Sequence, residues 1–187
     1  MSRLIFALSL LLSCLAVTAA KKSHGYSETV EASPPNTLPK KEKLTHIHFF
    51  WHDIVTGPNL SAVAVVPPQP DSPTFFGSVS VIDDAMTIGP DLSSGIIGRA
   101  QGLYTLASRG ELALLMAMNL VFTEGEYEGS TLTVLGRNSV SMKVREMPVI
   151  GGTNAFRLAR GYVHARTYQF NLKNGNAIVE YDVYVWH

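Results

Sequence analysis

Polar and apolar residues alternate along the chain from about residue 44 onward, as they do in half-buried β-strands. Residues 45–53 show the pattern most clearly, because their two faces differ in character. One face carries three histidines and a phenylalanine: His46, His48, Phe50 and His52. The other face is apolar until its last position: Ile47, Phe49, Trp51 and Asp53. This second face therefore ends in a carboxylate that follows two aromatic rings.

Further strands are predicted at short, regular spacing, separated by turns rich in glycine, proline, asparagine and aspartate. They span residues 62–66, 75–82, 96–107, 131–136, 141–149, 156–167 and 177–186. The segment 111–124 is ambiguous, because its leucine, alanine and methionine residues favour a helix whereas its neighbours favour a buried strand. Eight or nine strands without βαβ alternation predict an all-β fold. Closure into a barrel would remove exposed sheet edges and leave a lumen for side chains or one small ligand.

A glycine pair near the C-terminus predicts a hairpin turn. Gly151 and Gly152 lie between two runs of strand-forming residues, and glycine adopts positive φ without steric penalty. Pro148 has no backbone N–H to donate to a neighbouring strand, so a proline here is typical of an edge strand, a bulge or a strand end. Arg145 and Glu146 are neighbours and therefore face opposite sides of their strand. An inward Arg145 would hold a phenolate or carboxylate, and an ion pair across strands is the alternative.

Composition restricts the compartment and the partners. The 187 residues are a one-domain length, and 15 basic residues balance 15 acidic ones without a basic stripe, so nucleic acid is not an expected partner. A basic start, an apolar run and small residues predict a secretory signal peptide at 1–20, with an uncleaved membrane anchor as the alternative. Cys14, the only cysteine, lies within it, so the mature chain is expected to lack disulfides and cysteine metal sites.

The remainder of the chain is predicted to be one secreted, soluble domain. Residues 21–43 are polar and contain several prolines, which predicts a disordered arm before a domain at 44–187. Asn59 begins the sequon Asn59-Leu60-Ser61 in an evident loop, so we expect it to be glycosylated.

Asp53 is the first candidate for chemistry. With Phe49 and Trp51, which we assign to substrate binding, it would face an apolar lumen, where desolvation raises the pKa of a carboxyl and lets it donate a proton near neutrality. A solvated position at the barrel rim is the alternative. Asp83 and Asp84 are adjacent and face opposite sides, so we assign Asp83 to substrate binding and expect Asp84 to start a turn. The histidines lack a carboxylate at ligand spacing and no cofactor fingerprint occurs, so neither a metal nor a cofactor is expected.

From about residue 43 to the C-terminus, several motifs in unbroken order resemble the plant dirigent proteins. Besides residues 144–162, they are His52-Asp53-Ile54, Val81-Ile82-Asp83-Asp84, Gly98-Arg99-Ala100-Gln101-Gly102-Leu103-Tyr104, Phe122-Thr123-Glu124-Gly125, Gly129-Ser130-Thr131-Leu132, Gly136-Arg137-Asn138 and Val179-Glu180-Tyr181. The last turn differs from the family, since Asn154 stands where a glycine is usual. Asparagine tolerates left-handed geometry better than most residues, so we expect the turn to be kept.

The resemblance implies an eight-stranded antiparallel β-barrel of the allene oxide cyclase type, with 111–124 as a strand. It also implies a homo-oligomer, a trimer with a dimer as the alternative. The pocket residues of the family match Asp53, Tyr104 and Arg145, with Asn138 as a further substrate contact. Lignan-forming members carry an aspartate at the position of Asn138, and an amide cannot replace that acid. The sequence around Asn138 and Arg145 is most similar to that of the family branch that contains pterocarpan synthases and gossypol-directing proteins.

The function implied by the resemblance is stereocontrol in lignan-type phenylpropanoid metabolism of the plant apoplast. An external laccase or peroxidase generates phenoxy radicals, and the barrel determines which faces couple. Tyr104 and Arg145 would position phenol oxygens, and Asp53 would handle the proton when a quinone methide closes. One alternative is a pterocarpan synthase-like dehydratase, in which Asp53 protonates the leaving hydroxyl of an isoflavanol. Another is a non-catalytic extracellular module that binds a hydrophobic metabolite or a glycan.

Overall fold

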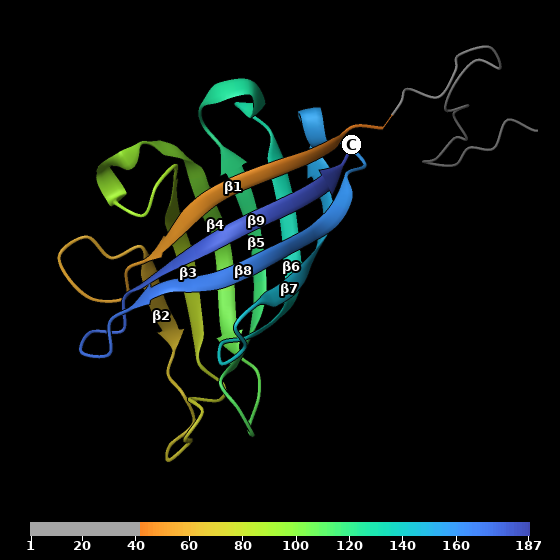
Figure 1. The fold of residues 1–187 in the computed structure, drawn as a ribbon. Helices are drawn as coiled ribbons and strands as arrows, with labels where there is room; N and C mark the ends of the chain where they lie inside the picture. Colours follow the sequence, from red (N-terminus) through yellow and green to blue (C-terminus); the bar gives the residue numbers. More distant parts are fainter. Residues whose placement is uncertain (1–41) are drawn as a thin grey trace, which may run out of the picture. The chain divides into compact units, whose positions relative to one another are not determined.

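Nine strands and three short 3₁₀ helices make up residues 42–187, the part of the chain that the computed structural model describes (Figure 1). The strands are β1 (Leu44–Asp53), β2 (Ala62–Val66), β3 (Val79–Thr87), β4 (Ile96–Leu106), β5 (Ala113–Phe122), β6 (Thr131–Ser139), β7 (Arg145–Thr153), β8 (Arg160–Phe170) and β9 (Ala177–Trp186). The 3₁₀ helices are η1 (Leu92–Ser94), η2 (Gly125–Tyr127) and η3 (Asn154–Phe156). The predicted signal peptide and nearly all of the predicted arm lie outside the described residues.

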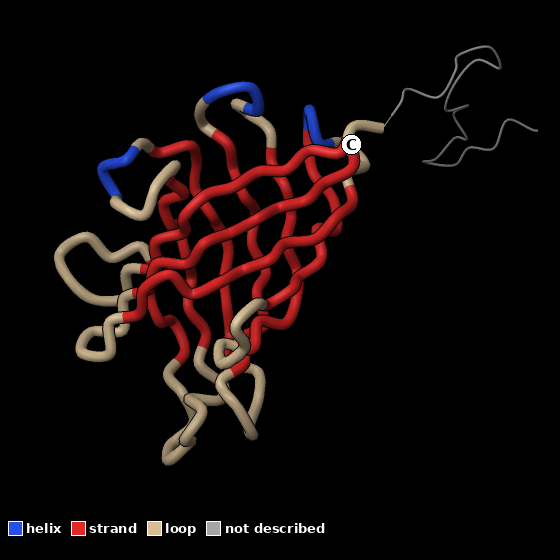
Figure 2. The backbone as a smooth tube through the Cα atoms, viewed as in Figure 1, coloured by secondary structure: helices blue, strands red, loops and turns tan. Residues whose placement is uncertain are grey.

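The strands form one closed antiparallel barrel (Figure 2). Their order is β1-β9-β8-β7-β6-β5-β4-β3-β2, and an additional pairing of β1 with β3 closes eight of them into a ring. The predicted eight-stranded barrel is therefore confirmed. The ambiguous segment contains β5, whose residues pair with both β4 and β6, so tertiary pairing overrides its helical propensity. Among residues 42–187, no helix is long and apolar enough to cross a membrane.

The barrel wall has one place where a strand changes its partner. On the same side of β3, Ile82 pairs with Ala62 of β2, whereas Ala85 pairs with His52 of β1. Between these two pairings the loop from β1 to β2 returns to the wall, and the Asp83 N–H donates to the Ser61 carbonyl at 2.8 Å. We call this place the seam. It brings a loop residue against the wall at the level of Asp83 and Asp84.

Inward-facing side chains fill the barrel with a largely apolar core. The predicted inner face of β1 is confirmed, since Phe49 and Trp51 are 0% and 3% exposed. Much of the remaining wall consists of flexible or branched aliphatic side chains, all fully buried: Met86, Met116, Met118, Leu120, Leu132, Val134, Met147, Val163 and Val183. The burial of these side chains supplies the main driving force for folding in this part of the chain.

Four aromatic rings close one end of the barrel, and we call them the aromatic plug. They are Phe122 at the end of β5, Tyr127 in η2, Phe156 in η3 and His187 at the C-terminus. The Phe156 ring centroid lies 4.7 Å from that of Tyr127 and 4.8 Å from that of His187. Figure 1 shows η2 and η3 at the same end as the C-terminus. The plug thus replaces solvent with tightly packed rings.

The polar atoms of the plug all have partners. Lys43 Nζ donates to the Tyr127 hydroxyl at 3.1 Å, and His187 Nε2 lies 2.9 Å from the Thr45 hydroxyl. The other ring nitrogen of His187 lies 2.8 Å from the Ala155 carbonyl. Burying these polar groups therefore carries little penalty.

The third predicted strand is displaced along the chain. It was expected at 75–82, but β3 begins at Val79 and continues to Thr87. Phe75 and Gly77 adopt positive φ values of 56° and 91°, which places them in a turn. The Phe75 side chain is accordingly exposed. The aromatic residues Phe75 and Phe76 favour a strand by propensity, but the backbone turns here before β3 begins.

The predicted hairpin turn at Gly151 and Gly152 is wrong, because both residues lie within β7. A side chain at Gly152 would meet the Thr131 carbonyl at 2.5 Å, so this glycine permits close approach of β6. The chain turns at η3 instead, where Asn154 has the predicted left-handed φ of 53°. The register shift in the β6–β7 pairing lies at Ile150, and the pairing with β6 ends at Val149, so Pro148 lies just beyond the end of this ladder, where no donor is needed.

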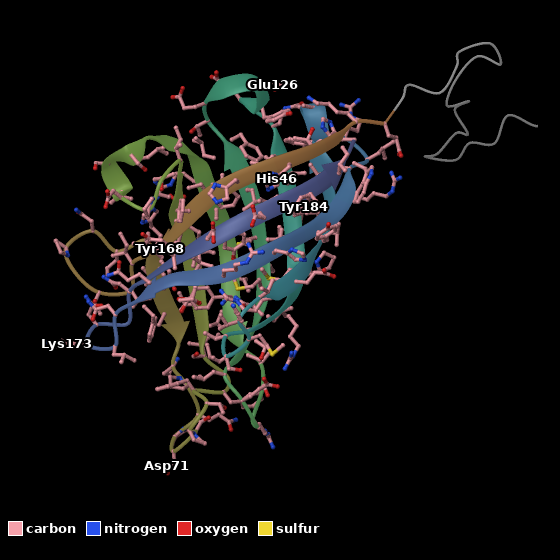
Figure 3. All side chains as sticks on the ribbon, viewed as in Figure 1. His46, Asp71, Glu126, Tyr168, Lys173 and Tyr184 are labelled. Carbon is pink, nitrogen blue, oxygen red and sulfur yellow. The ribbon has the colours of Figure 1, made fainter. Side chains whose placement is uncertain are left out.

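The outer face of β1 and β9 carries a polar and aromatic layer. His46 stacks on Tyr184 with ring centroids 4.5 Å apart, and its Nε2 lies 2.8 Å from Asp182 (Figure 3). His52 differs, since it is buried and bonds Thr87 at 2.7 Å. Within residues 42–187 no group of three histidine, cysteine, aspartate or glutamate residues could hold a metal ion.

Candidate functional site

Asp53 ends the inner face of β1, at the end of the barrel opposite the plug. We call this end the site end. The Tyr104 hydroxyl donates to both carboxylate oxygens, at 3.3 and 3.4 Å. Burial raises the pKa of Asp53 to about 6, and the Tyr104 hydrogen bond limits that rise. The carboxyl can therefore give or take a proton near neutrality, as predicted from its place after Phe49 and Trp51.

Tyr104 reaches Asp53 from the inner face of β4 and is buried. Burial raises the pKa of Tyr104, and the negative charge of Asp53 raises it further. The phenol consequently remains protonated and acts as a hydrogen-bond donor. The predicted pairing of Asp53 and Tyr104 in one lumen is thus seen as a direct contact. Asp53 also lines a recess of about 270 Å³ beside the start of β9.

Arg145 is the cation of the site. It opens β7, faces inward and is 5% exposed, whereas its neighbour Glu146 faces out and bonds His164 at 3.1 Å. Arg145 Nη1 donates to the Thr167 hydroxyl at 2.8 Å. No carboxylate within residues 42–187 lies within ion-pair distance of it, so the alternative of a cross-strand ion pair is not seen. Burial lowers the pKa of Arg145, because its charge is only partly solvated.

Asn138 orients this arginine. Its Oδ1 accepts a hydrogen bond from Arg145 Nε at 3.1 Å, and both side chains are buried. The amide therefore directs the guanidinium from β6, and it does not supply an acid. The structure thus groups Asn138 with Arg145, as the sequence predicted, and shows a positioning contact between them.

The assignment of Asp83 to the lumen is wrong, and Asp84 takes that place. Asp83 points outward and accepts hydrogen bonds from Arg99 Nε at 2.6 Å and from Gln101 at 3.0 Å. Asp84 is fully buried, in the inward row of Ile82. The reason is that β3 does not stop at Ile82, so the alternation continues through both aspartates. Because the chain continues as a strand where a turn was predicted, Asp84 faces inward and Asp83 faces outward.

Asp84 is held as a neutral acid near neutrality. Burial raises the pKa of Asp84 to about 8, and the charge of Asp53 adds to the rise. A hydrogen bond from the Ser61 hydroxyl to Asp84 Oδ1 opposes it. The lumen therefore contains two coupled carboxyls, which titrate as a pair with Asp53 ionising first.

Three buried polar atoms of the lumen have no hydrogen-bond partner among the described residues: Trp51 Nε1, Asp84 Oδ2 and the Tyr181 hydroxyl. Tyr181 is fully buried on β9 and stacks on Phe49, with ring centroids 5.2 Å apart. Burial raises its pKa, and Arg145 opposes the rise while Asp84 and Asp53 add to it. Unpaired polar atoms are costly in a core, so they indicate groups that a ligand can satisfy.

Sequence reasoning missed Asp84 and Tyr181 as site residues. The signal for Asp84 was its spacing of two residues from the apolar Ile82 and Met86. For Tyr181 it was the apolar row on β9, where every second residue is buried. Phe49 and Trp51 were predicted as substrate contacts, and both lie on this inner wall. Asn59 lies exposed in the loop before β2, and its glycosylation stays a prediction.

Comparisons with known proteins identify the family of this chain. The family model described as dirigent-like protein matches residues 44–186. Dirigent protein 21 of Arabidopsis thaliana is 48% identical over 186 residues, which cover 98% of this chain and 97% of that protein. Pterocarpan synthase 1 of Glycine max is 49% identical over 151 residues, which cover 79% and 81%. A solved structure of a pterocarpan synthase dirigent protein matches with a TM-score of 0.75 at 47% identity, over 81% of this chain and 88% of that one. The chain therefore belongs to the dirigent family.

Proposed function

We propose that this protein binds phenolic radicals in its lumen and determines which faces couple, while an external laccase or peroxidase makes the radicals. The observation that supports this most strongly is the pairing of a proton-exchanging carboxyl, Asp53, with the Tyr104 phenol in a lumen that also holds an uncompensated cation. These polar groups suit an aromatic molecule that carries oxygen atoms at its ends.

The roles of the residues follow from their charges. Arg145 attracts a phenolate or a quinone methide oxygen, because its own hydrogen bonds go only to neutral groups. Tyr104 donates to a second oxygen or keeps Asp53 oriented. Asp53 takes the proton released when a hydroxyl adds to the quinone methide, since its pKa of about 6 leaves it mostly ionised at neutral pH.

A second candidate function is the dehydration of an isoflavanol without an oxidant. Two observations favour it: Asp84 is still protonated near neutrality, and a pterocarpan synthase is 49% identical over 151 residues. An acid of the lumen would protonate the leaving hydroxyl, which departs as water. A phenol oxygen of the substrate would then add to the quinone methide and lose its proton to a carboxylate.

One experiment separates these functions. The purified protein is incubated with candidate phenols, with and without laccase, and with an isoflavanol in the absence of laccase, and the products are resolved by chiral chromatography. An enantiomeric excess that requires laccase supports radical coupling, and a product formed without laccase supports dehydration. Binding that leaves every product racemic would contradict both and indicate the non-catalytic binding module.

We also propose that the protein is secreted to the apoplast and works as a homo-oligomer. Secretion is supported by the sequence of residues 1–20. Oligomerisation is supported by an apolar row across neighbouring strands, in which the exposed Val81, Leu103 and Leu135 are joined through the half-buried Ala117. A monomer in sedimentation at micromolar concentration would contradict the oligomer, and an intracellular location of a tagged full-length chain would contradict secretion.

A further inference from the structure

The seam places a serine hydroxyl between the lumen and a recess on the outside of the barrel. Ser61 donates to Asp84 Oδ1 on its inner side. On its outer side, Ser61 lines a recess of about 350 Å³ together with Asn59, Leu60, Ile96 and Arg99. Asp84 itself has no exposed surface. Ser61 is therefore a polar link through the wall to a fully buried acid.

The seam explains why a side chain can pass through the wall here. Elsewhere in a closed sheet, ladder hydrogen bonds between neighbouring strands fill the wall. At Asp83 and Asp84, β3 has lost its pairing with β2 and has not yet paired with β1. The loop fills the space, and the only ladder-like bond there is from the Asp83 N–H to the Ser61 carbonyl. The Ser61 hydroxyl occupies the position left between the two ladders.

The hydrogen bonds of Ser61 give its hydroxyl two arrangements. Its oxygen accepts from the Ile54 N–H at 3.1 Å. Its single proton has two possible acceptors, Asp84 Oδ1 and the His52 carbonyl at 3.2 Å. When Asp84 is ionised, the proton points to the carboxylate. When Asp84 is protonated, the carboxyl can donate to Ser61 and the serine proton turns to the carbonyl, so both states of the acid are satisfied.

From this geometry we propose that Ser61 is a proton port, through which Asp84 exchanges its proton with the outer recess and not through the mouth of the lumen. The recess is open to solvent and is large enough for water, and Asn59, Ser61 and Arg99 supply polar groups among its mainly apolar lining residues. An acid in that water gives a proton to the Ser61 oxygen as the serine proton passes to the Asp84 carboxylate. The reverse transfer releases a proton outward. Only O–H bonds form and break, so charge and atoms balance.

The port would let Asp84 regain or lose its proton while a ligand occupies the lumen. Asp84 Oδ2 and Trp51 Nε1 are buried and have no hydrogen-bond partner among the described residues, although Trp51 is close enough to Asp84 to oppose the rise in its pKa. The acid is thus bonded to the seam through Oδ1, whereas Oδ2 is unpaired. The charged and titratable groups around it are Asp53 on β1, Tyr104 and Arg99 on β4, and Tyr181 on β9. The biological purpose of the port rests on the proposed function, but the port itself does not, because proton exchange needs no substrate.

The test follows the carboxyl of Asp84 directly in the ligand-free secreted protein. The infrared C=O band of protonated Asp84 is assigned by its loss in Asp84→Asn. Its shift after rapid mixing into D₂O, below the pKa of Asp84, gives the exchange rate. We expect Ser61→Ala to slow exchange by about tenfold or more, which corresponds to about 1.4 kcal/mol in barrier height. It should also raise the pKa of Asp84, since the serine hydrogen bond lowers it.

Matched controls separate the port from glycosylation, because Ser61 also completes the sequon of Asn59. Asn59→Gln removes the sequon and keeps the hydroxyl, and Ser61→Thr keeps both, so both variants should exchange at the wild-type rate. Slow exchange in Asn59→Gln alone would overturn the proposal in favour of an effect of the glycan. Failure of Ser61→Thr to restore the rate would show that the serine acts only as a structural support.

A second variant keeps the proposal testable if Ser61→Ala does not fold. Ile96 lines the outer recess and is 47% exposed, so Ile96→Trp should fill the recess without touching the lumen. We expect slow exchange in this variant as well. Wild-type exchange in Ser61→Ala or in Ile96→Trp would mean that the proton arrives through the lumen, and the port would be refuted. No product is measured, so this failure is distinct from failure of the proposed stereocontrol.

Discussion

The two ends of the barrel use inward-facing residues in opposite ways. At the plug end, the Tyr127 hydroxyl and both ring nitrogens of His187 have hydrogen-bond partners. At the site end, Trp51 Nε1 and the Tyr181 hydroxyl have none within the described residues, and two carboxyls have raised pKa values. One end is therefore organised for stability, and the other keeps costly polar groups ready for a ligand.

The largest expected effect is loss of stereocontrol at the site end. Asp53→Asn and Arg145→Ala should each lower the rate of stereoselective product formation by about 10²–10⁴-fold, because each removes a proton-transfer or charge interaction with the reacting molecule. The double variant should lose little more, since both act on one ligand. Chiral product analysis measures this. Glu146→Ala, which changes the outward neighbour of Arg145, is the control and should behave as wild type.

The corresponding change at the plug end should affect stability and leave the site intact. Phe156→Ala removes a fully buried ring and should lower the free energy of unfolding by about 3–5 kcal/mol. Denaturant unfolding measures the change, and product handedness below the transition should not alter. Leu158→Ala, at an 89% exposed position nearby, should cost almost nothing. Equal effects at both positions would show that the plug does not stabilise the barrel.

The pH dependence of stability should reveal the free-energy cost of burying the ionised carboxylate of Asp84. Its pKa rises from 3.8 to about 8 on folding, so the folded state binds the proton more tightly. The wild type should therefore lose stability as the pH rises from about 4 to about 8, with an upper bound of about 6 kcal/mol for a shift of about four pKa units. Asp84→Asn should be more stable than wild type at pH 8 and similar at pH 4. Parallel curves for the two proteins would contradict the burial of an ionisable acid.

A pair of hydroxyl deletions makes the smallest and most direct comparison of the two ends. Tyr127→Phe removes a hydroxyl that bonds Lys43 and should destabilise by about 0.5–1.5 kcal/mol. Tyr181→Phe removes an unpaired buried hydroxyl and should be neutral or stabilising. Thermal unfolding of both variants measures the difference. A stability loss in Tyr181→Phe equal to that in Tyr127→Phe would mean that the Tyr181 hydroxyl has a partner in the folded protein.

Alternation predicted much of this fold, because the inner and outer faces of a strand differ by one residue. It placed Phe49, Trp51 and Asp53 on one face of a strand, and the family resemblance supplied the barrel and the pocket positions of Tyr104 and Arg145. It failed wherever a strand boundary was misplaced, since a shift in the boundary turns a strand residue into a turn residue. The local pattern predicts a turn at Asp84, which lies within β3, and a hairpin at Gly152, which packs closely against Thr131 within β7. The seam depends on pairing between distant strands, which no local pattern encodes.

The methionines of the inner wall set the mechanical character of the lumen. Met86, Met116, Met118 and Met147 are buried there, and each side chain has several rotatable bonds and a polarisable sulfur. A wall of this kind can reshape around aromatic rings of different outline at low energetic cost. Discrimination between substrates must then come from the fixed polar anchors at the site end. Evolution of a new substrate preference would accordingly proceed by moving oxygen-binding groups, with the apolar wall left unchanged.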